Sequence, residues 1–286
     1  MLRVGPLALA APAVTVLLVF FVAPLTAFAV YSLLTGAFYE VSGPLTLDNY
    51  REAVESPLHR TLARNSLLVG LFAAVASVAF ALPIAYWLRY TRSRWRLLVM
   101  FLIIASFLAS YLVRIYAWRT ILGSNGLINS GLDQLGVIDD PLTFFLYNRF
   151  AVTIALVHIY LPYVVLVLYA GLGPLNPAYL EAAQDLGAGR WQRWWRVVLP
   201  VAAAPVASAF LFVFVLSAAD YVTPQFLGGT SGGMLGVIVQ QNMTAQGDYA
   251  MGAAIAFAML AAFLALYGVV ALALRLTRLD RLRFVS

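Results

Sequence analysis

The sequence predicts an all-α integral membrane protein with six transmembrane helices. Three observations lead to this fold class. Hydrophobic residues form 63% of the chain and charged residues 10%, compared with roughly a half and a quarter in soluble domains. Six separate segments reach the ~20 apolar residues that cross a bilayer. The arginines between these segments are concentrated in alternate loops, as in a multi-pass protein.

The six segments are expected to form one membrane domain that covers residues 1–286. The first segment contains Ala27-Phe28-Ala29, which is similar to a signal-peptide cleavage site. Its apolar run is much longer than the roughly 7–15 residues of a signal-peptide core, so we expect a retained helix. The expected spans are Leu7–Leu34, Ser66–Leu88, Leu97–Trp118, Ala151–Leu172, Val201–Ala219 and Met251–Leu274.

The loops between the spans have features of their own. Leu45–Glu55 reads as an amphipathic helix that begins near Asp48, and Ile121–Arg149 is the longest polar excursion. Leu227–Tyr249 is rich in glycine. The remaining long polar interval, residues 176–200, separates the fourth and fifth spans.

The arginines predict the orientation. With a cytoplasmic N-terminus, twelve arginines and three acidic residues lie inside, and six arginines and nine acidic residues lie outside or at outer helix ends. The positive-inside rule favours this topology, with both termini and residues 176–200 in the cytoplasm. The net charge of +6 is therefore a sign of topology, and no nucleic-acid partner is expected. The twelve are Arg3, Arg89, Arg92, Arg94, Arg96, Arg190, Arg193, Arg196, Arg275, Arg278, Arg281 and Arg283.

Composition also excludes several activities. The chain has no lysine, so it lacks the P-loop lysine that contacts nucleotide phosphates. It has no cysteine, which excludes a thiol nucleophile, and its two histidines, His59 and His158, are too far apart to suggest a metal site. We therefore expect no catalytic residue, no metal and no cofactor in this chain.

Residues 176–200 contain a short predicted helix. Asn176 can cap its N-terminus, Pro177 suits its first turn, and Gly187 can end it. The segment reads Glu181-Ala182-Ala183, three residues, Gly187, nine residues, Val197, one residue, Leu199-Pro200. This spacing resembles the complete cytoplasmic EAA signature of the membrane subunits of binding-protein-dependent ABC importers.

The resemblance implies the type I importer permease fold, with a coupling helix between the fourth and fifth spans. It implies that this helix docks into a partner ATPase; the coupling residues would be Glu181, Ala182, Ala183, Asp185 and Gly187. The alternative is an ordinary cytoplasmic linker helix. The implied partners are a second homologous permease, an ATPase dimer that binds ATP and Mg, an extracytoplasmic substrate-binding protein and the lipid bilayer. The implied location is the bacterial inner membrane.

Further patches resemble one permease subunit family, that of spermidine/putrescine transporters. They are Arg114-Ile115-Tyr116-Ala117-Trp118, Asn125–Asn129, Tyr160-Leu161-Pro162-Tyr163, Asp220–Pro224 and Leu227-Gly228-Gly229. Importers for opines or amino-acid derivatives, phosphonates, thiamine or iron share such patches, so these substrates stay open. A secondary transporter is the alternative from a different class, although one carboxylate, Asp220, gives it little support.

The candidate residues of a translocation path are Asp220, Tyr221, Arg114, Tyr116, Trp118 and Tyr160. A carboxylate at the depth of Asp220 is costly in a membrane and usually faces protein, water or a partner charge. It could contact a cationic solute, pair with Arg114 or cap a loop. An unpaired Arg114 would oppose a cation, so we expect an ion pair with Asp220 or a substrate that carries negative charge. The aromatic residues could stack on an organic cation or anchor the span ends at the membrane interface.

Overall fold

A computed structural model describes residues 6–37 and 39–277. The described residues are mostly helical, which confirms the predicted fold class. The contacts divide the chain into two compact units. One contains the described residues of Met1–Thr61 and Leu235–Ala262, and the other those of Leu62–Met234 and Phe263–Ser286. The prediction of one permease domain over the whole chain stays a prediction.

The first unit combines apolar helices with a small hairpin. The hairpin pairs its strands antiparallel, with Gly36 opposite Val41, and the sequence had not indicated it. Its turn is fixed from outside, because the backbone N–H of Tyr39 donates to the Gly247 carbonyl at 2.8 Å. The elements are α1 (Pro6–Leu17), η1 (Leu18–Val22), α2 (Ala23–Tyr31), β1 (Thr35–Ala37), β2 (Glu40–Ser42), α3 (Asp48–Glu55), α13 (Leu235–Gln241), η4 (Asn242–Gln246) and the first part of α14 (Tyr249–Leu276).

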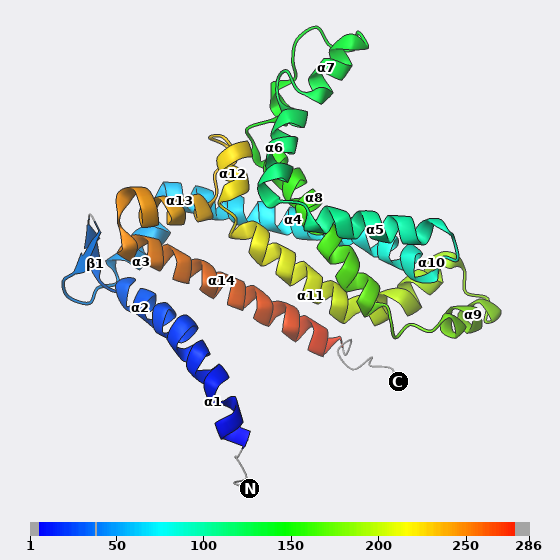
Figure 1. Cartoon of the computed structure of the whole chain (residues 1–286), viewed down its shortest axis with the longest axis horizontal. Coiled ribbons are helices and arrows are strands. Elements are labelled where there is room, and N and C mark those ends of the chain that lie inside the picture. Colours follow the sequence, from blue (N-terminus) through cyan, green and yellow to red (C-terminus); the bar gives the residue numbers. More distant parts are fainter. Residues whose placement is uncertain (1–5, 38, 278–286) are drawn as a thin grey trace. The chain divides into compact units, whose positions relative to one another are not determined.

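The second unit contains most of the membrane helices. In Figure 1, α9 and α10 lie at one end of this unit, beside the neighbouring ends of α4 and α5. The elements are α4 (Pro57–Tyr90) from Leu62 on, α5 (Trp95–Leu108), α6 (Tyr111–Leu122), α7 (Leu127–Gln134), η2 (Thr143–Phe145), α8 (Arg149–Gly171), α9 (Pro177–Asp185), α10 (Arg190–Arg193), η3 (Trp194–Val198), α11 (Leu199–Ala218), α12 (Val222–Leu227) and the last part of α14.

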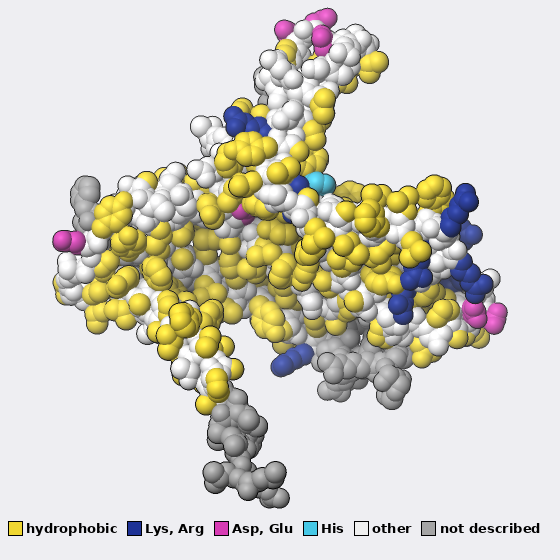
Figure 2. Space-filling view, viewed as in Figure 1, with side chains coloured by type: hydrophobic (Ala, Val, Ile, Leu, Met, Phe, Trp, Pro, Cys, Tyr) yellow, Lys and Arg dark blue, Asp and Glu magenta, His cyan; other side chains and the backbone are white. Residues whose placement is uncertain are grey.

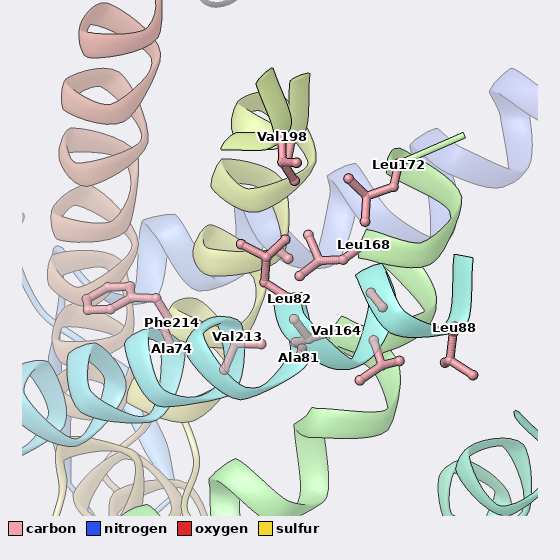
Figure 3. Close-up of a cluster of buried hydrophobic side chains, with 14 of the residues drawn as sticks. Ala74, Ala81, Leu82, Leu88, Val164, Leu168, Leu172, Val198, Val213 and Phe214 are labelled. Atoms are coloured by element: carbon pink, nitrogen blue, oxygen red, sulfur yellow. The ribbon is translucent and has the colours of Figure 1, made fainter. Parts of the chain in front are cut away.

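Small residues allow α4, α8 and α11 to pack closely. Ala74, Ala81 and Ala85 of α4 are fully buried in one apolar cluster with residues of α8 and α11. A Cβ at Gly70 would lie 2.8 Å from the Cβ of Ala218, so α4 and α11 approach there as closely as a glycine permits. Figure 3 shows Leu82, Val164 and Val213 converging in this cluster. Close approach through small residues is the usual basis of helix packing in membranes.

The described chain has five helices that are long and apolar enough to cross a membrane, or six if one bent pair counts as a single span. The five are Ala11–Tyr31, Pro57–Tyr90, Arg149–Gly171, Arg190–Ala218 and Tyr249–Leu276. The 23 residues of α8 extend about 34 Å at 1.5 Å per residue, which is enough for a ~30 Å hydrocarbon core.

The expected third span, Leu97–Trp118, is not one continuous helix. It is divided into α5 and α6, and the helix axis turns by 99° at the break. Ala109 and Ser110 adopt extended backbone angles, with ψ values of 144° and 138°. These two residues end the first helix and direct the chain into the second. Length and hydropathy do not reveal such a break.

Several local predictions agree with the structure. Helix α3 occupies the predicted amphipathic segment and begins at Asp48. Arginine side chains, dark blue in Figure 2, gather around α9 and α10, and acidic side chains, magenta, lie at the tip of α7. Of the arginines assigned to the cytoplasm, Arg3, Arg278, Arg281 and Arg283 lie outside the described residues.

Candidate coupling segment and polar cluster

The EAA segment forms the short helix α9, and its two ends explain part of the spacing. The Asn176 side chain accepts a hydrogen bond from the N–H of Ala178 at 3.0 Å, with Pro177 in the first turn. At the other end, Gly187 adopts a left-handed φ of +82°. The N–H of Gly187 donates to the Gln184 carbonyl at 2.8 Å, and the N–H of Ala188 donates to the Ala183 carbonyl at 2.9 Å. This pair of bonds is the Schellman motif, which favours glycine at this position.

One face of α9 is free of the rest of the described chain. Glu181, Ala182 and Asp185 are exposed, and Leu186 is 87% exposed. Among the described residues, a Cβ at Gly187 would meet no atom within 4 Å. The exposed surface of α9 thus combines alanines, carboxylates and one apolar side chain, that of Leu186.

The second half of the segment links α9 to the membrane core. Arg193 Nη1 donates to Gln184 Oε1 at 2.9 Å, which ties α10 to α9. The π-turn η3 follows, and the Leu199 N–H donates to the Trp194 carbonyl across it. Val197 and Leu199 pack against the α4–α8–α11 cluster. The apolar positions at the end of the motif therefore face the core, whereas Glu181 and Ala182 are exposed and Ala183 is half-buried.

A polar cluster joins α6 to the start of α12. Asp220 Oδ2 accepts a hydrogen bond from the Tyr111 hydroxyl at 2.8 Å. The same carboxylate accepts from the backbone N–H groups of Val222 at 3.1 Å and Thr223 at 3.2 Å. The Tyr111 hydroxyl also lies 2.8 Å from Thr223 Oγ1. Asp220 thus caps the N-terminus of α12. A capping role was one of the alternatives that the sequence left open.

Arg114 does not form the expected ion pair with Asp220. Its guanidinium donates from Nη1 to the Ile159 carbonyl of α8 at 2.9 Å and from Nη2 to the Ala109 carbonyl at 3.0 Å. Its Nε is buried without a hydrogen-bond partner. Within residues 6–37 and 39–277, the ion pair that forms is Arg51–Glu55. Arg114 therefore satisfies one backbone carbonyl at the break between α5 and α6, that of Ala109, and one within α8, that of Ile159.

The predicted aromatic residues fall into separate places. Tyr116 packs edge-on against Phe226 with ring centroids 5.3 Å apart, and Tyr221 is 44% exposed. Tyr160 is partly buried against both apolar clusters of the second unit. Trp118 instead donates from Nε1 to His158 Nδ1 at 3.2 Å. His158 borders an apolar groove of about 560 Å³ between α4, α5 and α8.

Two members of the polar cluster were absent from the sequence-based candidates. Tyr111 was not named among them, and Thr223 appeared only as part of the segment Asp220–Pro224. The spacing of Asp220 and Thr223, with a proline following, is typical of a capped helix start and could have indicated the cap. The approach of Tyr111 across 109 residues has no local signal.

The family described as "Binding-protein-dependent transport system inner membrane component" matches residues 61–279. The chain is similar to the spermidine/putrescine transport system permease protein PotB of Haemophilus influenzae, with 29% identity over 74% of this chain and 73% of the relative. It is also similar to PotB of Escherichia coli, with 32% identity over 73% of this chain and 75% of the relative.

Solved structures give the same architecture. A chain of a bacterial alginate ABC transporter, crystallised in complex with an alginate pentasaccharide-bound periplasmic protein, matches with a TM-score of 0.78. The match covers 97% of this chain and 95% of that chain at 18% identity. At this identity the likeness concerns the fold.

Proposed function

Because the chain belongs to the binding-protein-dependent transport system inner membrane components, we propose that it forms half of a polyamine import path driven through α9. The family supplies the membrane permease of ABC importers, which is not the catalytic subunit, and a separate ATPase hydrolyses ATP. In the proposal, that ATPase binds ATP and Mg, and this chain needs no cofactor. A second homologous permease completes the path.

The coupling role is assigned to Glu181, Ala182, Ala183, Asp185 and Gly187. Its support is the complete motif spacing, together with the exposed outer face of α9. The alanines permit close approach of a partner surface, and the carboxylates of Glu181 and Asp185 can accept hydrogen bonds from it. Movement of the ATPase would displace α9 and open the path alternately to the two sides of the membrane.

The orientation of the chain is part of the proposal. The end of the second unit that carries α9 also carries Arg92, Arg94, Arg190 and Arg196, and Figure 2 shows arginines gathered there. This supports a cytoplasmic α9 under the positive-inside rule. The acidic lobe around α7 would then face outward, toward the substrate-binding protein that the family name implies.

The single observation that carries the substrate is 32% identity to a spermidine/putrescine permease over 73% of this chain. The site supports a cationic solute in one respect. Asp220 accepts three hydrogen bonds, whereas a carboxylate has about four acceptor positions. A spare acceptor and an uncompensated negative charge suit an ammonium group.

The remaining candidates would act around that carboxylate. The exposed rings of Tyr116 and Tyr221 could contact an alkylammonium chain by cation–π attraction, with Trp118 and Tyr160 further along the path. Arg114 stays among the proposed path residues, but with a structural role, because its N–H groups donate to the carbonyls of Ala109 and Ile159. It would shape the path at the break in the third span.

The test is uptake by the complete importer in proteoliposomes, with labelled spermidine and the cognate binding protein. We expect accumulation that requires ATP and the binding protein, and that putrescine inhibits but thiamine, phosphonates, opines and ferric iron do not. Preferred binding of one of those solutes would contradict the polyamine assignment. Uptake driven by an ion gradient without an ATPase would contradict the importer mechanism for this chain.

A second measurement addresses the path. Asp220→Asn should lower spermidine uptake about tenfold or more at subsaturating substrate, because a hydrogen bond to a charged group contributes roughly 1.5–3 kcal/mol. Asp248→Asn is the matched control, since that aspartate also caps a helix start, by accepting from the Met251 N–H at 2.9 Å. Equal uptake by the two variants would exclude Asp220 from the path.

A further inference from the structure

The coupling segment is attached to a third membrane helix, α4, besides the two helices that it connects. The Tyr90 hydroxyl at the end of α4 donates to the Leu175 carbonyl at 2.8 Å and lies 3.4 Å from the Leu172 carbonyl. The neighbouring Arg89 donates from Nη2 to the Gly173 carbonyl at 3.2 Å. These carbonyls belong to the residues that lead from α8 into α9. The residues that precede α9 are therefore bound to α4.

The residues that follow α9 contact the same end of α4. The ring of Tyr86 contacts the ring of Trp194, in η3, with centroids 5.0 Å apart and planes at 77°. Tyr86 also packs against Tyr90, at 4.9 Å. Edge-to-face aromatic pairs of this kind contribute beyond the area that they bury. Tyr86, Arg89 and Tyr90, which we call the α4 clamp, thus hold the residues before and after α9 at one place.

An apolar layer lies next to the clamp. Leu88 of α4, Leu172 and Leu175 before α9, and Val198 after it are each at most 1% exposed and belong to one buried cluster. Figure 3 shows Leu88, Leu172 and Val198 in this cluster. Close-packed interiors transmit displacement because they have little free volume. A movement of the segment that left α4 behind would break the hydrogen bonds of Tyr90 and Arg89 and separate this layer.

We propose that the α4 clamp is a positioning device that makes α4 move with the coupling segment during transport. The inference rests on the proposed coupling function of α9. Covalent connection alone carries displacement from α9 to α8 and α11. The clamp adds α4, which packs against both through Ala74, Ala81 and Ala85, so that three helices move as one body.

The carbonyls that lead from α8 into α9 lie beyond the helix C-terminus, where a helix leaves its last C=O groups without partners of its own. The clamp supplies donors to them from a different helix, which adds a mechanical link without a new covalent connection. A coupling defect with intact assembly is therefore the property to measure.

The experiment uses the complete reconstituted importer and measures spermidine uptake and ATP hydrolysis in the same vesicles. Tyr90→Phe removes the hydroxyl and keeps the ring, and a double variant adds Trp194→Leu. The matched control is Tyr267→Phe on α14, where the tyrosine is 60% exposed. We expect both clamp variants to assemble with the ATPase and to consume about three- to tenfold more ATP per solute, within the range by which single residues alter coupling between sites. The control should keep the wild-type ratio.

Two results would overturn this inference and leave the proposed coupling function standing. One is a wild-type ratio of ATP consumed to spermidine transported in both clamp variants. The other is a loss of uptake and a loss of ATP hydrolysis that are both proportional to the loss of assembled complex. The second would mean that the contacts serve assembly only. Failure of the proposed coupling function would look different. In that case the wild-type chain would not co-purify with an ATPase, or Glu181→Arg would leave both association and uptake unchanged, and the inference would fall with it.

Discussion

The left-handed conformation of Gly187 gives the sharpest prediction about the coupling segment. Its φ of +82° lies in the region that L side chains rarely adopt, and a Cβ there would meet nothing within 4 Å. Within residues 6–37 and 39–277, replacement by alanine is therefore free of clashes and changes only the backbone energy. The left-handed region costs a non-glycine residue roughly 1–2 kcal/mol, which corresponds to about a five- to thirtyfold change in an equilibrium constant.

The end of α9 at Gly187 is short and exposed. Two hydrogen bonds close it, from Gly187 to the Gln184 carbonyl and from Ala188 to the Ala183 carbonyl. We expect Gly187→Ala to lower ATP-driven uptake about five- to tenfold by unwinding this end. Gly187→Asn should lower it by about twofold or less, since asparagine tolerates the left-handed region. Gly187→Asp has the same backbone tolerance but adds a charge to the proposed docking face, and should abolish uptake while the chain remains inserted.

The matched control lies two residues away. Gly189 also has open space at its Cβ position, but its φ of −65° suits any residue. Gly189→Ala should therefore keep most of the uptake. The assay is initial uptake in proteoliposomes with equal amounts of inserted permease. Equal uptake by Gly187→Ala and Gly189→Ala would refute the role of the backbone turn, and normal uptake by Gly187→Asp would refute the docking role.

Three further substitutions test the packing and the polar cluster by thermal unfolding of the purified complex. Tyr111→Phe should lower the free energy of unfolding by about 1.5–3 kcal/mol, because Asp220 loses a charge-assisted hydrogen bond. Asn129→Ala should cost about 2–4 kcal/mol and speed proteolysis of residues 121–148, because one buried side chain there makes three hydrogen bonds to backbone groups. Gly171→Ala should cost about 1–3 kcal/mol, because its Cβ would lie 2.4 Å from a proline of α11, whereas Gly268→Ala, with open space, should not destabilise.

The sequence predicted the features that depend on neighbouring residues. The cap at Asn176, the stop at Gly187 and the start of α3 at Asp48 each follow from side chains and backbone preferences within a few positions. The membrane helices follow from apolar length, because a chain in lipid must satisfy its backbone within each helix. The coupling role of α9 rests on the motif and stays a prediction.

Contacts between distant residues could not be predicted. Tyr111 reaches Asp220 across 109 residues, and Tyr90 reaches Leu175 across 85. No periodicity or spacing specifies which hydroxyl will meet which carbonyl once the helices have packed. The hairpin at residues 35–42 was not predicted for a related reason, because its turn is bonded to Gly247, far along the chain.

The break in the third span shows how a polar residue in an apolar segment should be interpreted. Hydropathy averages over residues 97–118 and cannot detect that Ala109 and Ser110 leave the helix. A helix interrupted inside a membrane releases backbone carbonyls, and each costs several kcal/mol if no partner reaches it. Arg114 lies four residues beyond the break and donates to one such carbonyl, that of Ala109. The presence of an arginine was therefore a sign of irregular backbone nearby. The guanidinium keeps its positive charge in these bonds and does not pair with Asp220, so Arg114 still opposes a cationic solute close to it.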